Sequence, residues 1–474
     1  MNKIRLALIL LVLIPSICFG RKFYFSASGS DSYTSTQAQN PSTPWKTLTK
    51  LQSFSGSMLA QDSFLFKRGD AFADSLTLFN KSNLYFGDYG AGEKPLFWGK
   101  GGTIEIIFEL YNFDNCKFEN LRVSDTTIDK FDLTVVTNIQ KAFEFAQGSF
   151  YTCVTNCDFD RIGTGVYFTN TARFDTVRNC EMSYLKMIKN TPIIINPDDD
   201  YGGTPIQLSG SGCVITKNFF HHCIALSYDY GYDGGAVEIF EEGDTIQNNI
   251  ISYNTLYKNN GSFEHGSNND GIANNPIMDN KIYYNKIINC SSVFYYNNNG
   301  QYKSVLRNQQ FYNNVIVQDT VSPTGNLLMG SMATTEAISN IVTFRNNIFY
   351  VTNGASIMRA GFFNAGQLVH TNNIYYQSGG GVLNFTADAT EATGIKNYWL
   401  DTSNANALYW DFRINNTSFA YANGVDVGIT RDFDNVVVDD PPSIGAYEYS
   451  APPIPPTPTP TQKLYIRKRF VNAN

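Results

Sequence analysis

The sequence has 474 residues and a net charge of −7; 43% of its residues are hydrophobic and only 16% are charged. A net negative charge of this size disfavours nucleic acid or an anionic membrane surface as a partner. Beyond the first twenty residues no stretch is apolar enough to form a membrane-spanning helix, which needs ~20 residues.

The first twenty residues have the pattern of a secretory signal peptide. Lys3 and Arg5 precede an apolar run over residues 6–14, and the small residue Gly20 marks the expected cleavage point. Cleavage removes two positive charges from a total of −7 and leaves about −9. Cys18 invites lipidation, but the residue before it is larger than lipoprotein signals use. The sequence therefore predicts a secreted, periplasmic or cell-surface protein.

Four further segments are expected along the chain. Residues 21–103 are predicted to form an N-terminal cap with the first coils, and residues 104–377 a repeat region. Residues 378–449 are predicted to form the last coils and a closing segment. Residues 450–474 begin with PPIPPTPTPT, a stiff linker that cannot join a sheet, and end in a short basic tail. This end is interpreted as a spacer, with an attachment segment as the alternative.

The repeat region shows two landmarks in each of nine coils. A short strand recurs as IIFELYN, KAFEFAQ, GVYFTNT, PIQLSGS, AVEIFEE, SFEHGSN, VFYYNNN, LLMGSMA and IMRAGFF. A second landmark follows each strand as DNCKF, TNCDF, RNCEM, TKNFF, QNNII, YYNKI, YNNVI, RNNIF and TNNIY. The double register, with turn residues and loops of uneven length between strands, indicates an all-β solenoid, specifically a right-handed parallel β-helix.

Asparagine and cysteine share one position of the second landmark. That position is occupied in the nine coils by Cys116, Cys157, Cys180, Asn218, Asn249, Asn285, Asn314, Asn347 and Asn373. Asparagine tolerates left-handed dihedrals and bonds to a neighbouring coil, so we expect one internal stack. Cysteine in such a stack is a small buried residue, which predicts reduced thiols without disulfides.

Both ends of the mature chain resemble a known group. FYFSASGSDSYTSTQAQNPSTPWKTLTKL, QDSFLFKRGDAF and YFGDYGAGEKPLFWG look like the N-terminal cap of exported bacterial β-helix proteins of the pectate-lyase-like superfamily. DFRINNTSFAYANGVDVGITRDFDN and PPSIGAYEY are similar to the tail of the same group. The resemblance implies a right-handed parallel β-helix, but the superfamily includes lyases, hydrolases, epimerases and non-catalytic adhesins.

Side chains alternate along a strand, so one position of the first landmark faces outward in every coil. The residues at this position are Glu109, Glu144, Tyr167, Gln207, Glu238, Glu264, Tyr295, Met329 and Arg359. Glu238 and Glu264 are then neighbours on consecutive coils, ~5 Å apart at the backbone. Such a pair raises the pKa of one carboxyl group unless a cation lies between them. Glu109 and Glu144 are interpreted as ordinary surface residues of this column rather than as part of a site.

The longest loops of the repeat region surround this pair. Residues 186–203 and 225–235 precede the strands of Gln207 and Glu238, whereas residues 266–280 and 297–308 follow Glu264 and Tyr295. The loops predict a groove with acids on its floor and tyrosines at its edge, which suits an extracellular polysaccharide. The predicted substrate-binding residues are Tyr230, Tyr232, Gln207, Tyr295, Tyr296, Lys303 and Arg307. A solvated pair facing loop cations is the alternative.

A calcium site is a further expectation for this wall. Asp198, Asp199, Asp200 and Asp229 offer the oxygen ligands that Ca²⁺ prefers, although no spaced calcium-loop motif is present. A solvated acidic turn is the alternative. The predicted catalytic residues are Glu238, Glu264, Asp233 and His265. Alternation directs His265 inward as a packed histidine, unless the strand ends there and turns it into the groove.

Two reactions and one binding function fit these residues. A glycoside hydrolase needs an acid and a second carboxylate, which Glu238 and Glu264 supply. A polysaccharide lyase needs a base and a cation beside a uronic acid, for which Lys303, Arg307 and the acidic wall with Asp233 are candidates. The aspartate motifs of polygalacturonases are absent from the sequence, and no clear match exists to the motifs of alginate and chondroitin lyases. A non-catalytic glycan-binding adhesin is the third possibility.

Overall fold

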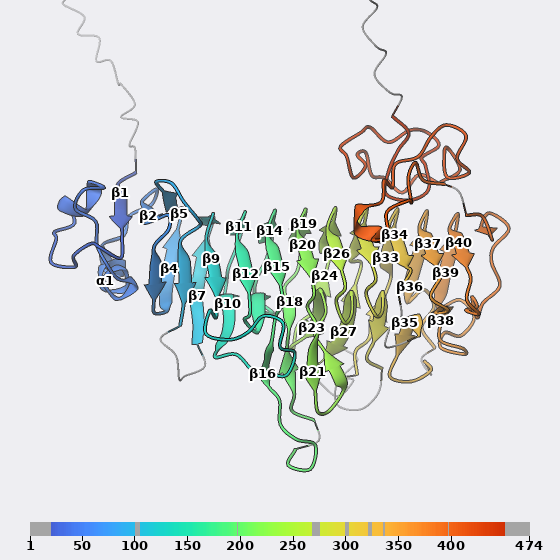
Figure 1. Ribbon diagram of the computed structural model, residues 1–474, viewed down its shortest axis with the longest axis horizontal. Helices are drawn as coiled ribbons and strands as arrows, with labels where there is room; N and C mark the ends of the chain where they lie inside the picture. The colour runs from blue at the N-terminus through green and yellow to red at the C-terminus, as the bar shows by residue number, and fades with distance from the viewer. Residues whose placement is uncertain are drawn as a thin grey trace, which may run out of the picture.

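The computed structural model describes residues 20–99, 105–196, 198–267, 275–298, 303–320, 325–334, 337–396 and 398–450 (Figure 1). The expected signal peptide therefore lies outside the described residues up to position 19, and the Pro/Thr-rich end lies outside them from position 451. Among the described residues, no helix is long and apolar enough to cross a membrane.

Three long parallel sheets run side by side along a rod. The first contains β1 (Lys22–Phe25), β2 (Ser63–Lys67), β5 (Tyr85–Tyr89), β8 (Lys117–Glu119), β11 (Cys153–Thr155), β14 (Thr176–Arg178), β19 (Val214–Thr216), β25 (Ile250–Ser252), β29 (Lys281–Tyr283), β33 (Gln309–Tyr312), β36 (Val342–Arg345) and β39 (Leu368–Thr371). We call it sheet A.

Sheet B contains β3 (Ala71–Ala73), β6 (Leu96–Trp98), β9 (Arg122–Ser124), β12 (Asp158–Asp160), β15 (Glu181–Ser183), β20 (Phe219–His221), β26 (Thr255–Tyr257), β30 (Lys286–Ile288), β34 (Val315–Gln318), β37 (Ile348–Val351), β40 (Ile374–Gln377) and β41 (Ala392–Thr393). Sheet C contains β4 (Leu76–Ser82), β7 (Glu105–Asp114), β10 (Ile139–Phe145), β13 (Thr164–Phe168), β18 (Thr204–Leu208), β23 (Val237–Glu241), β27 (Phe263–Ser267), β31 (Phe294–Tyr296), β35 (Asn326–Gly330) and β38 (Ser356–Met358).

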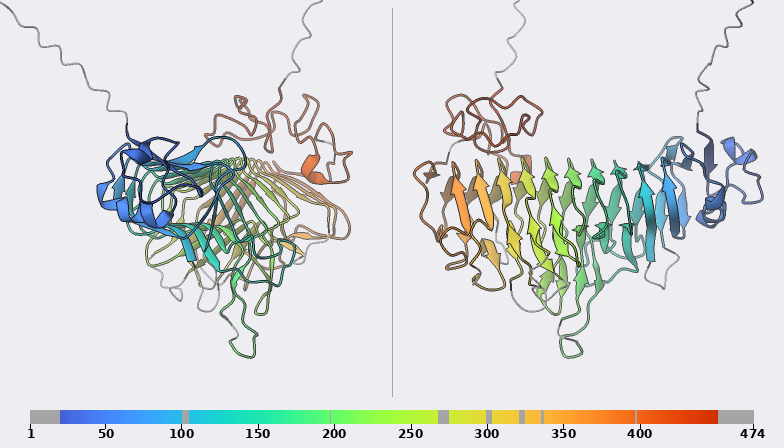
Figure 2. Two further views of the ribbon diagram at one scale, coloured as in Figure 1. Left: turned by 60° about the vertical axis from the view of Figure 1, so that its left-hand side comes forward. Right: turned by 180° about the vertical axis from the view of Figure 1, so that it is seen from behind.

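Successive strands visit sheets C, A and B in turn, as β7, β8 and β9 do, and each pairs in parallel with its equivalent in the next coil. Parallel crossovers of this kind are right-handed. The chain is thus a right-handed parallel β-helix, as the repeats predict, and Figure 2 shows its stacked coils obliquely and from behind. A short fourth sheet of β24 (Ile246–Gln247), β28 (Ile277–Met278) and β32 (Leu306–Arg307) runs between sheets C and A.

In-register stacking places like residues above one another in the core. Phe23, Phe64, Phe86 and Phe118 form such a column in sheet A, with successive ring centroids 5.5, 5.1 and 4.5 Å apart. The N-terminal end of the rod is covered by η1 (Gln37–Gln39), α1 (Leu48–Phe54) and η2 (Ser55–Ser57). Leu48 and Leu51 of α1 are fully buried against this core.

The Asn and Cys positions form two internal ladders rather than the one that the sequence predicts. One ladder contains Cys157, Cys180, Asn218, Asn254, Asn285, Asn314, Asn347 and Asn373. The other contains Cys116, Thr152, Asp175, Cys213, Asn249 and Asn280. Cys116 and Asn249 therefore lie in the second ladder and not, as the sequence predicts, with the other seven residues, because two corners of each coil use the same turn.

In both ladders the left-handed residue is the one before the buried rung, not the rung itself. Asn248 and Tyr253, for example, have φ angles of 59° and 58° and precede Asn249 and Asn254. The rung then accepts a backbone N–H from the coil before it. The seven described cysteines are free, as predicted, and all except Cys153 are buried.

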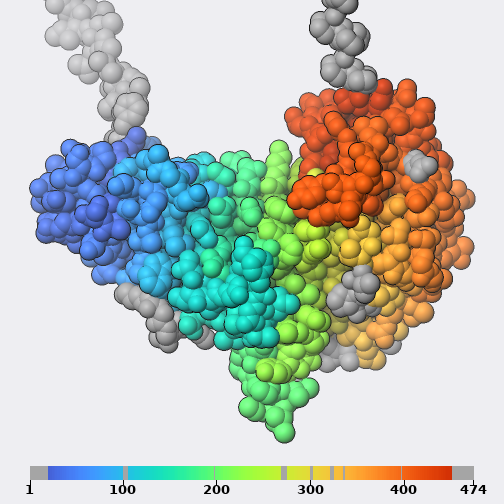
Figure 3. Space-filling model, in the orientation of Figure 1, coloured from blue at the N-terminus to red at the C-terminus, as the bar shows by residue number. Residues whose placement is uncertain are grey.

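The last described segment, residues 398–450, has little regular structure beyond η4 (Ala407–Tyr409). It forms a separate lobe on the rod (Figure 3) and has a core of its own. Tyr398, Phe412 and Ile444 belong to this core together with Tyr284 and Ile348 of the rod. The closing segment therefore covers the outer surface of the coils at the C-terminal half.

Candidate functional site

Two hairpins leave the rod from adjacent coils and form one wall of a cavity. The first pairs β16 (Met187–Lys189) with β17 (Tyr201–Gly202), and the second pairs β21 (Ala225–Ser227) with β22 (Gly231–Asp233). Both project from the same side of the rod in Figure 1. They come from the two loops that precede Gln207 and Glu238, so the predicted first wall is confirmed.

Side-chain and backbone bonds hold the two hairpins together. The Ser227 hydroxyl donates to Asp200 Oδ2 over 2.8 Å. Asp229 Oδ2 accepts the backbone N–H groups of Asp199 (2.8 Å) and Asp200 (3.1 Å). This network fixes the position of Asp233 at the end of β22, whose Oδ1 accepts the Gly234 N–H over 2.6 Å.

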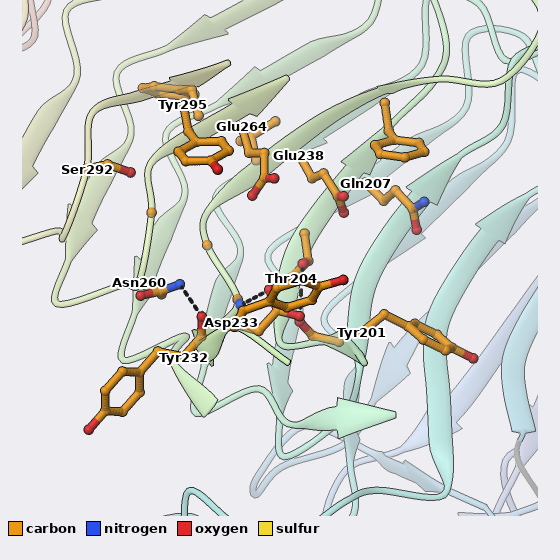
Figure 4. Close-up of a pocket in the computed structure, with 18 of the residues that line it drawn as sticks. Tyr201, Thr204, Gln207, Tyr232, Asp233, Glu238, Asn260, Glu264, Ser292 and Tyr295 are labelled. Carbon is orange, nitrogen blue, oxygen red and sulfur yellow. Dashed lines mark hydrogen bonds between the residues drawn. The ribbon is translucent and has the colours of Figure 1, made fainter. Parts of the chain in front are cut away.

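The floor of the cavity is the outward column of sheet C. Gln207 pairs with Glu238, Glu238 with Glu264, and Glu264 with Tyr295, each on the next coil. These registers confirm the alignment made from the sequence. Figure 4 shows the carboxyl groups of Glu238 and Glu264 side by side, both directed toward the hairpin that carries Asp233.

Floor and hairpins enclose a cavity of about 800 Å3, within the range of roughly 300–1,000 Å3 that is typical of ligand sites. Its acidic and aromatic lining residues are Asp199, Asp200, Tyr201, Tyr230, Tyr232, Asp233, Glu238, Phe240, Phe263, Glu264 and Tyr295. Thr204, Gln207, Asn260, Ser262, Ser292 and Asn297 add neutral hydrogen-bonding groups. None of the described residues that line it is Lys, Arg or His.

Three carboxyl groups of the cavity have raised pKa values. Burial, then the charge of Glu264, raises the pKa of Glu238 well above its usual range. Burial also raises the pKa of Glu264 to about 7, with a further contribution from Asp233. The pKa of Asp233 is likewise raised to about 7 by burial. All three side chains keep part of their surface open to the cavity, which moderates this desolvation.

The hydrogen bonds distinguish the two glutamates. Asn297 Nδ2 donates to Glu264 Oε1 over 3.1 Å, which favours the ionised form of Glu264. Glu238 lies closest to the centre of negative charge, since Glu264, Asp233 and Glu242 all raise its pKa. The raised pKa favours the protonated form of Glu238, and Glu264 is the better candidate for the charged group.

The remaining acids of the column have structural partners, as the sequence predicts. Glu109 accepts hydrogen bonds from Tyr111 (2.7 Å) and Thr77 (3.0 Å). Glu144 forms an ion pair with Lys141, with 2.8 Å between Oε2 and Nζ. Only the part of the column beneath the hairpins is left for a ligand.

An acidic cluster lies at the outer end of the wall. Ligand oxygens of Asp199, Asp200 and Asp229 lie within 4.8 Å of one another. Asp199 Oδ1 and Asp229 Oδ1 are buried and have no hydrogen-bond partner. Lys189 forms an ion pair with the other oxygen of Asp199 at 2.7 Å. Two orphaned carboxylate oxygens beside a third carboxylate are a donor set that fits a hard divalent cation.

Several predicted site residues lie elsewhere. His265 and Tyr296 point into the core and are fully buried, because they alternate with Glu264 and Tyr295 along their strands. Contrary to the expectation that they belong to the site, neither His265 nor Tyr296 lines the cavity. Asp198 bonds to the Tyr230 hydroxyl rather than joining the acidic cluster.

Neither predicted loop cation reaches the cavity. Arg307 is exposed in β32 and pairs with Met278 of the short fourth sheet, so it faces a different side of the rod. Lys303 is not among the described residues that line the cavity. Residues 268–274 and 299–302 of the predicted second wall lie outside the described residues.

The sequence did not single out Tyr201, Thr204, Asn260, Ser292 and Asn297 as cavity residues. Asn260 and Ser292 lie just before β27 and β31, and Thr204 is the first residue of β18, so each precedes the outward column by a few residues. The sequence signal that could have identified them is that each lies a few residues before Glu264, Tyr295 or Gln207. Tyr201 comes from β17, whose pairing across the hairpin is a tertiary feature.

No model of a known protein family and no curated protein matches the chain. Among solved structures it is similar to a rhamnogalacturonan lyase at 14% identity, with a TM-score of 0.48 over 75% of this chain and 87% of that one. It is also similar to pectate lyase Pel9A at 12% identity, with a TM-score of 0.49 over 92% and 98% of the two chains. A tailspike protein of E. coli bacteriophage HK620 in complex with a pentasaccharide has 11% identity and a TM-score of 0.45 over 72% and 66%.

Its stacked parallel sheets give this chain the right-handed parallel β-helix fold. A fold of this kind accommodates lyases, hydrolases and binding proteins, so the reaction has to be inferred from the residues of the cavity.

Proposed function

We propose that this chain is an exported glycoside hydrolase that binds an extracellular polysaccharide across sheet C and cleaves it between Glu238 and Glu264. The observation that carries the proposal is the pair of adjacent, partly desolvated carboxyl groups in a cavity with no described cationic lining residue. Glycosidic cleavage needs two carboxyl groups with different protonation states, and pairs whose pKa values are pushed apart provide them.

In this mechanism Glu238 is the general acid. Burial and the surrounding carboxylates raise its pKa and so favour the protonated form, and the proton passes to the glycosidic oxygen as the bond breaks. Glu264, held by Asn297, is the nucleophile or the base that activates water. Asp233 faces both from the hairpin and adds negative potential that stabilises positive charge on the sugar ring in the transition state.

The rest of the cavity suits a neutral sugar chain. Tyr201, Tyr230 and Tyr232 stand on the hairpins, where aromatic faces can stack on sugar rings. Amide and hydroxyl groups of Gln207, Asn260 and similar residues can bond to sugar hydroxyls. A uronic acid carboxylate would meet three acids there and no described cation.

A calcium-dependent lyase is the second candidate, because of the acidic cluster on the wall. Asp199 and Asp229 would hold the ion through their unpartnered Oδ1 atoms, together with the neighbouring carboxylate of Asp200. A calcium ion bound there would neutralise the carboxylate of a uronic acid and favour removal of the neighbouring proton. Asp233 would then be the base, with its pKa near neutrality.

The test is turnover of a panel of neutral and acidic polysaccharides, with reducing ends and unsaturated products both recorded. We expect new reducing ends without unsaturation, and a loss of at least 100-fold in kcat for Glu238→Gln and for Glu264→Gln. Glu109→Gln, in the same column but outside the cavity, is the matched control and should keep full activity. Unsaturated products would instead identify the lyase, and binding without cleavage would identify an adhesin.

The pH profile of the wild-type chain tests the assignment of roles. Glu264 must be ionised, so kcat/KM should rise with pH up to about 7, and it should fall again at higher pH as Glu238 loses its proton. Replacing Asn297 with Ala removes the donor to Glu264 and should move the rising limb to higher pH. A profile that falls steadily from pH 5 would contradict these roles.

A further inference from the structure

A second cavity lies on a different face of the rod. It has a volume of about 530 Å3 and is built on β9, β12, β15 and β20 of sheet B, whereas the first cavity is built on sheet C. Its size is within the range for small-ligand sites, roughly 300–1,000 Å3. No residue lines both cavities. The first cavity has only acids among its described charged residues, but this one has cations as well.

Positive charge is concentrated at one end of the second cavity. Arg122 and Arg161 share a single carboxylate: Arg122 Nη2 lies 3.0 Å from Asp160 Oδ2, and Arg161 Nε lies 2.6 Å from Asp160 Oδ1. Asp160 therefore balances only one of the two guanidinium charges of this group. The Lys186 ammonium group is buried just behind and donates to the backbone carbonyls of Lys130 and Asp132, over 2.8 and 2.5 Å.

Lys130 completes this end. Among the described residues its Nζ has aromatic partners only, at 4.8 Å from the Phe131 ring centroid and 5.2 Å from that of Tyr184. The side chain is exposed, so the ammonium group is accessible from the cavity. Arg122, Arg161 and Lys130 thus line this end of the cavity together with the carboxylate of Asp160, and Lys186 lies behind them near the charges of Asp132 and Asp129.

The opposite end of the cavity has the reverse balance. Lys94 forms an ion pair with Asp158 at 2.6 Å, and Glu181 lies 3.1 Å from His221. Glu93 adds a third carboxylate to this end. A ligand that fits both ends carries an anionic group on one side and hydrogen-bond donors such as hydroxyl groups on the other. A saccharide with a carboxylate or a sulfate has this chemistry.

The Tyr184 side of the cavity favours a ring-shaped ligand. The ring of His222 stacks on Tyr184 with centroids 4.9 Å apart and an angle of 3° between the planes, which fixes the orientation of the tyrosine. Phe131 packs edge-on against Tyr184, with ring centroids 5.4 Å apart, and is 65% exposed. Exposure of this ring to water costs free energy, and the apolar face of a sugar that packs on it would reduce that cost. Guanidinium groups recognise carboxylate and sulfate through paired hydrogen bonds.

We propose that this second cavity is a binding site for an anionic sugar unit, with its carboxylate or sulfate held between Arg161 and Lys130. The site anchors an acidic glycan on sheet B, independently of any cleavage on sheet C. It does not depend on the proposed function, because none of its residues lines the first cavity.

Affinity gel electrophoresis of the full chain tests the site, with the Glu238→Gln variant as background so that no polymer is cut. The gels contain polygalacturonate, dextran sulfate or neutral dextran. We expect retardation by at least one of the two acidic polymers and not by dextran, which also distinguishes carboxylate from sulfate. Added salt should weaken the retardation, since exposed charges are screened within ~10 Å at 0.1 M.

Variants locate the binding. Lys130→Gln should weaken retardation at least threefold, and Arg161→Lys, which keeps the charge but loses the planar fork, should weaken it similarly. Lys281→Gln, an exposed cation on sheet A, is the matched control and should behave as the parent does. Equal retardation of all variants, retardation by neutral dextran alone, or no retardation by any polymer would overturn the proposal.

Discussion

Asp175 shows how one residue type alters an otherwise uniform ladder. It occupies a rung where other coils have Asn, Cys or Thr, and its Oδ1 accepts the Thr152 N–H over 2.7 Å. Its Oδ2 is buried and has no partner. Burial raises the pKa of this carboxyl group to about 7, so the folded chain prefers the protonated form.

This pKa makes the stability of the fold depend on pH. The folded-state pKa lies above the unfolded value of about 3.9, so the folded chain binds an extra proton between these values and loses stability as the pH rises. At pH 8 the cost relative to pH 4 is roughly 4 kcal/mol for full ionisation. Asp175→Asn should remove this cost, and chemical unfolding at pH 5 and pH 8 measures it. If Asp175→Asn increases the free energy of unfolding no more at pH 8 than at pH 5, the raised pKa of Asp175 is not the cause of the pH dependence.

The internal ladder that runs from Cys157 to Asn373 is the element that ties neighbouring coils together. Asn254 Nδ2 donates to Asn285 Oδ1 and to the Ile215 carbonyl, each over 3.0 Å, while its own Oδ1 accepts from Asn218. Buried polar groups that lose their partners keep the full cost of desolvation. The ladder therefore favours one register of the coils over any slipped one.

Replacement of Asn254 tests this role. Asn254→Ala leaves several buried groups without partners and should reduce the free energy of unfolding by about 3 kcal/mol. Asn254→Cys should cost less, because Cys180 occupies an equivalent rung and its Sγ accepts the Cys157 N–H over 3.4 Å. Urea unfolding of both variants measures the difference. Equal losses would contradict the role given to the hydrogen-bond acceptor at this rung.

The two hairpins of the cavity wall are the element with the strongest expected response to a cation. If calcium binds the free oxygens of Asp199 and Asp229, it binds only the folded chain and raises its Tm by mass action. We expect a calcium-dependent increase in Tm for the wild-type chain, reversed by chelation. Asp229→Asn should abolish it, while Asp426→Asn, at an exposed turn, should not. An identical shift in both variants would exclude this site.

At the scale of the whole molecule, the closing segment shields the outer surface of the C-terminal coils. Phe412 is buried there, 5.0 Å from the Trp399 ring centroid, and Tyr253 of the rod donates to the Arg431 carbonyl over 2.9 Å. Phe412→Ala should cost about 3–5 kcal/mol, as is typical of buried Phe truncations. Phe419→Ala, at a side chain that is 40% exposed, should cost much less. Limited proteolysis should release the segment only in the first variant.

The sequence by itself determined the fold and the column of residues on the face of the site. Parallel stacking in register converts a repeat along the chain into a column in space, so the neighbours Glu238 and Glu264 could be predicted by aligning coils. Inward and outward positions follow from alternation, which also placed His265 in the core by the same rule. The buried, unbridged cysteines followed from the same repeat.

Tertiary structure alone decided which ladder each corner residue joins and where most of the loop residues lie. Two corners of each coil use the same turn, so local sequence could not assign Cys116 and Asn249 to their ladder. The direction of a long loop is not fixed by coil register, and for this reason Arg307 proved to lie on another face. The pairing of the two hairpins through Asp200 and Asp229, and the second cavity on sheet B, join residues far apart in the chain. No repeat relates these residues, and only the packed structure brings them together.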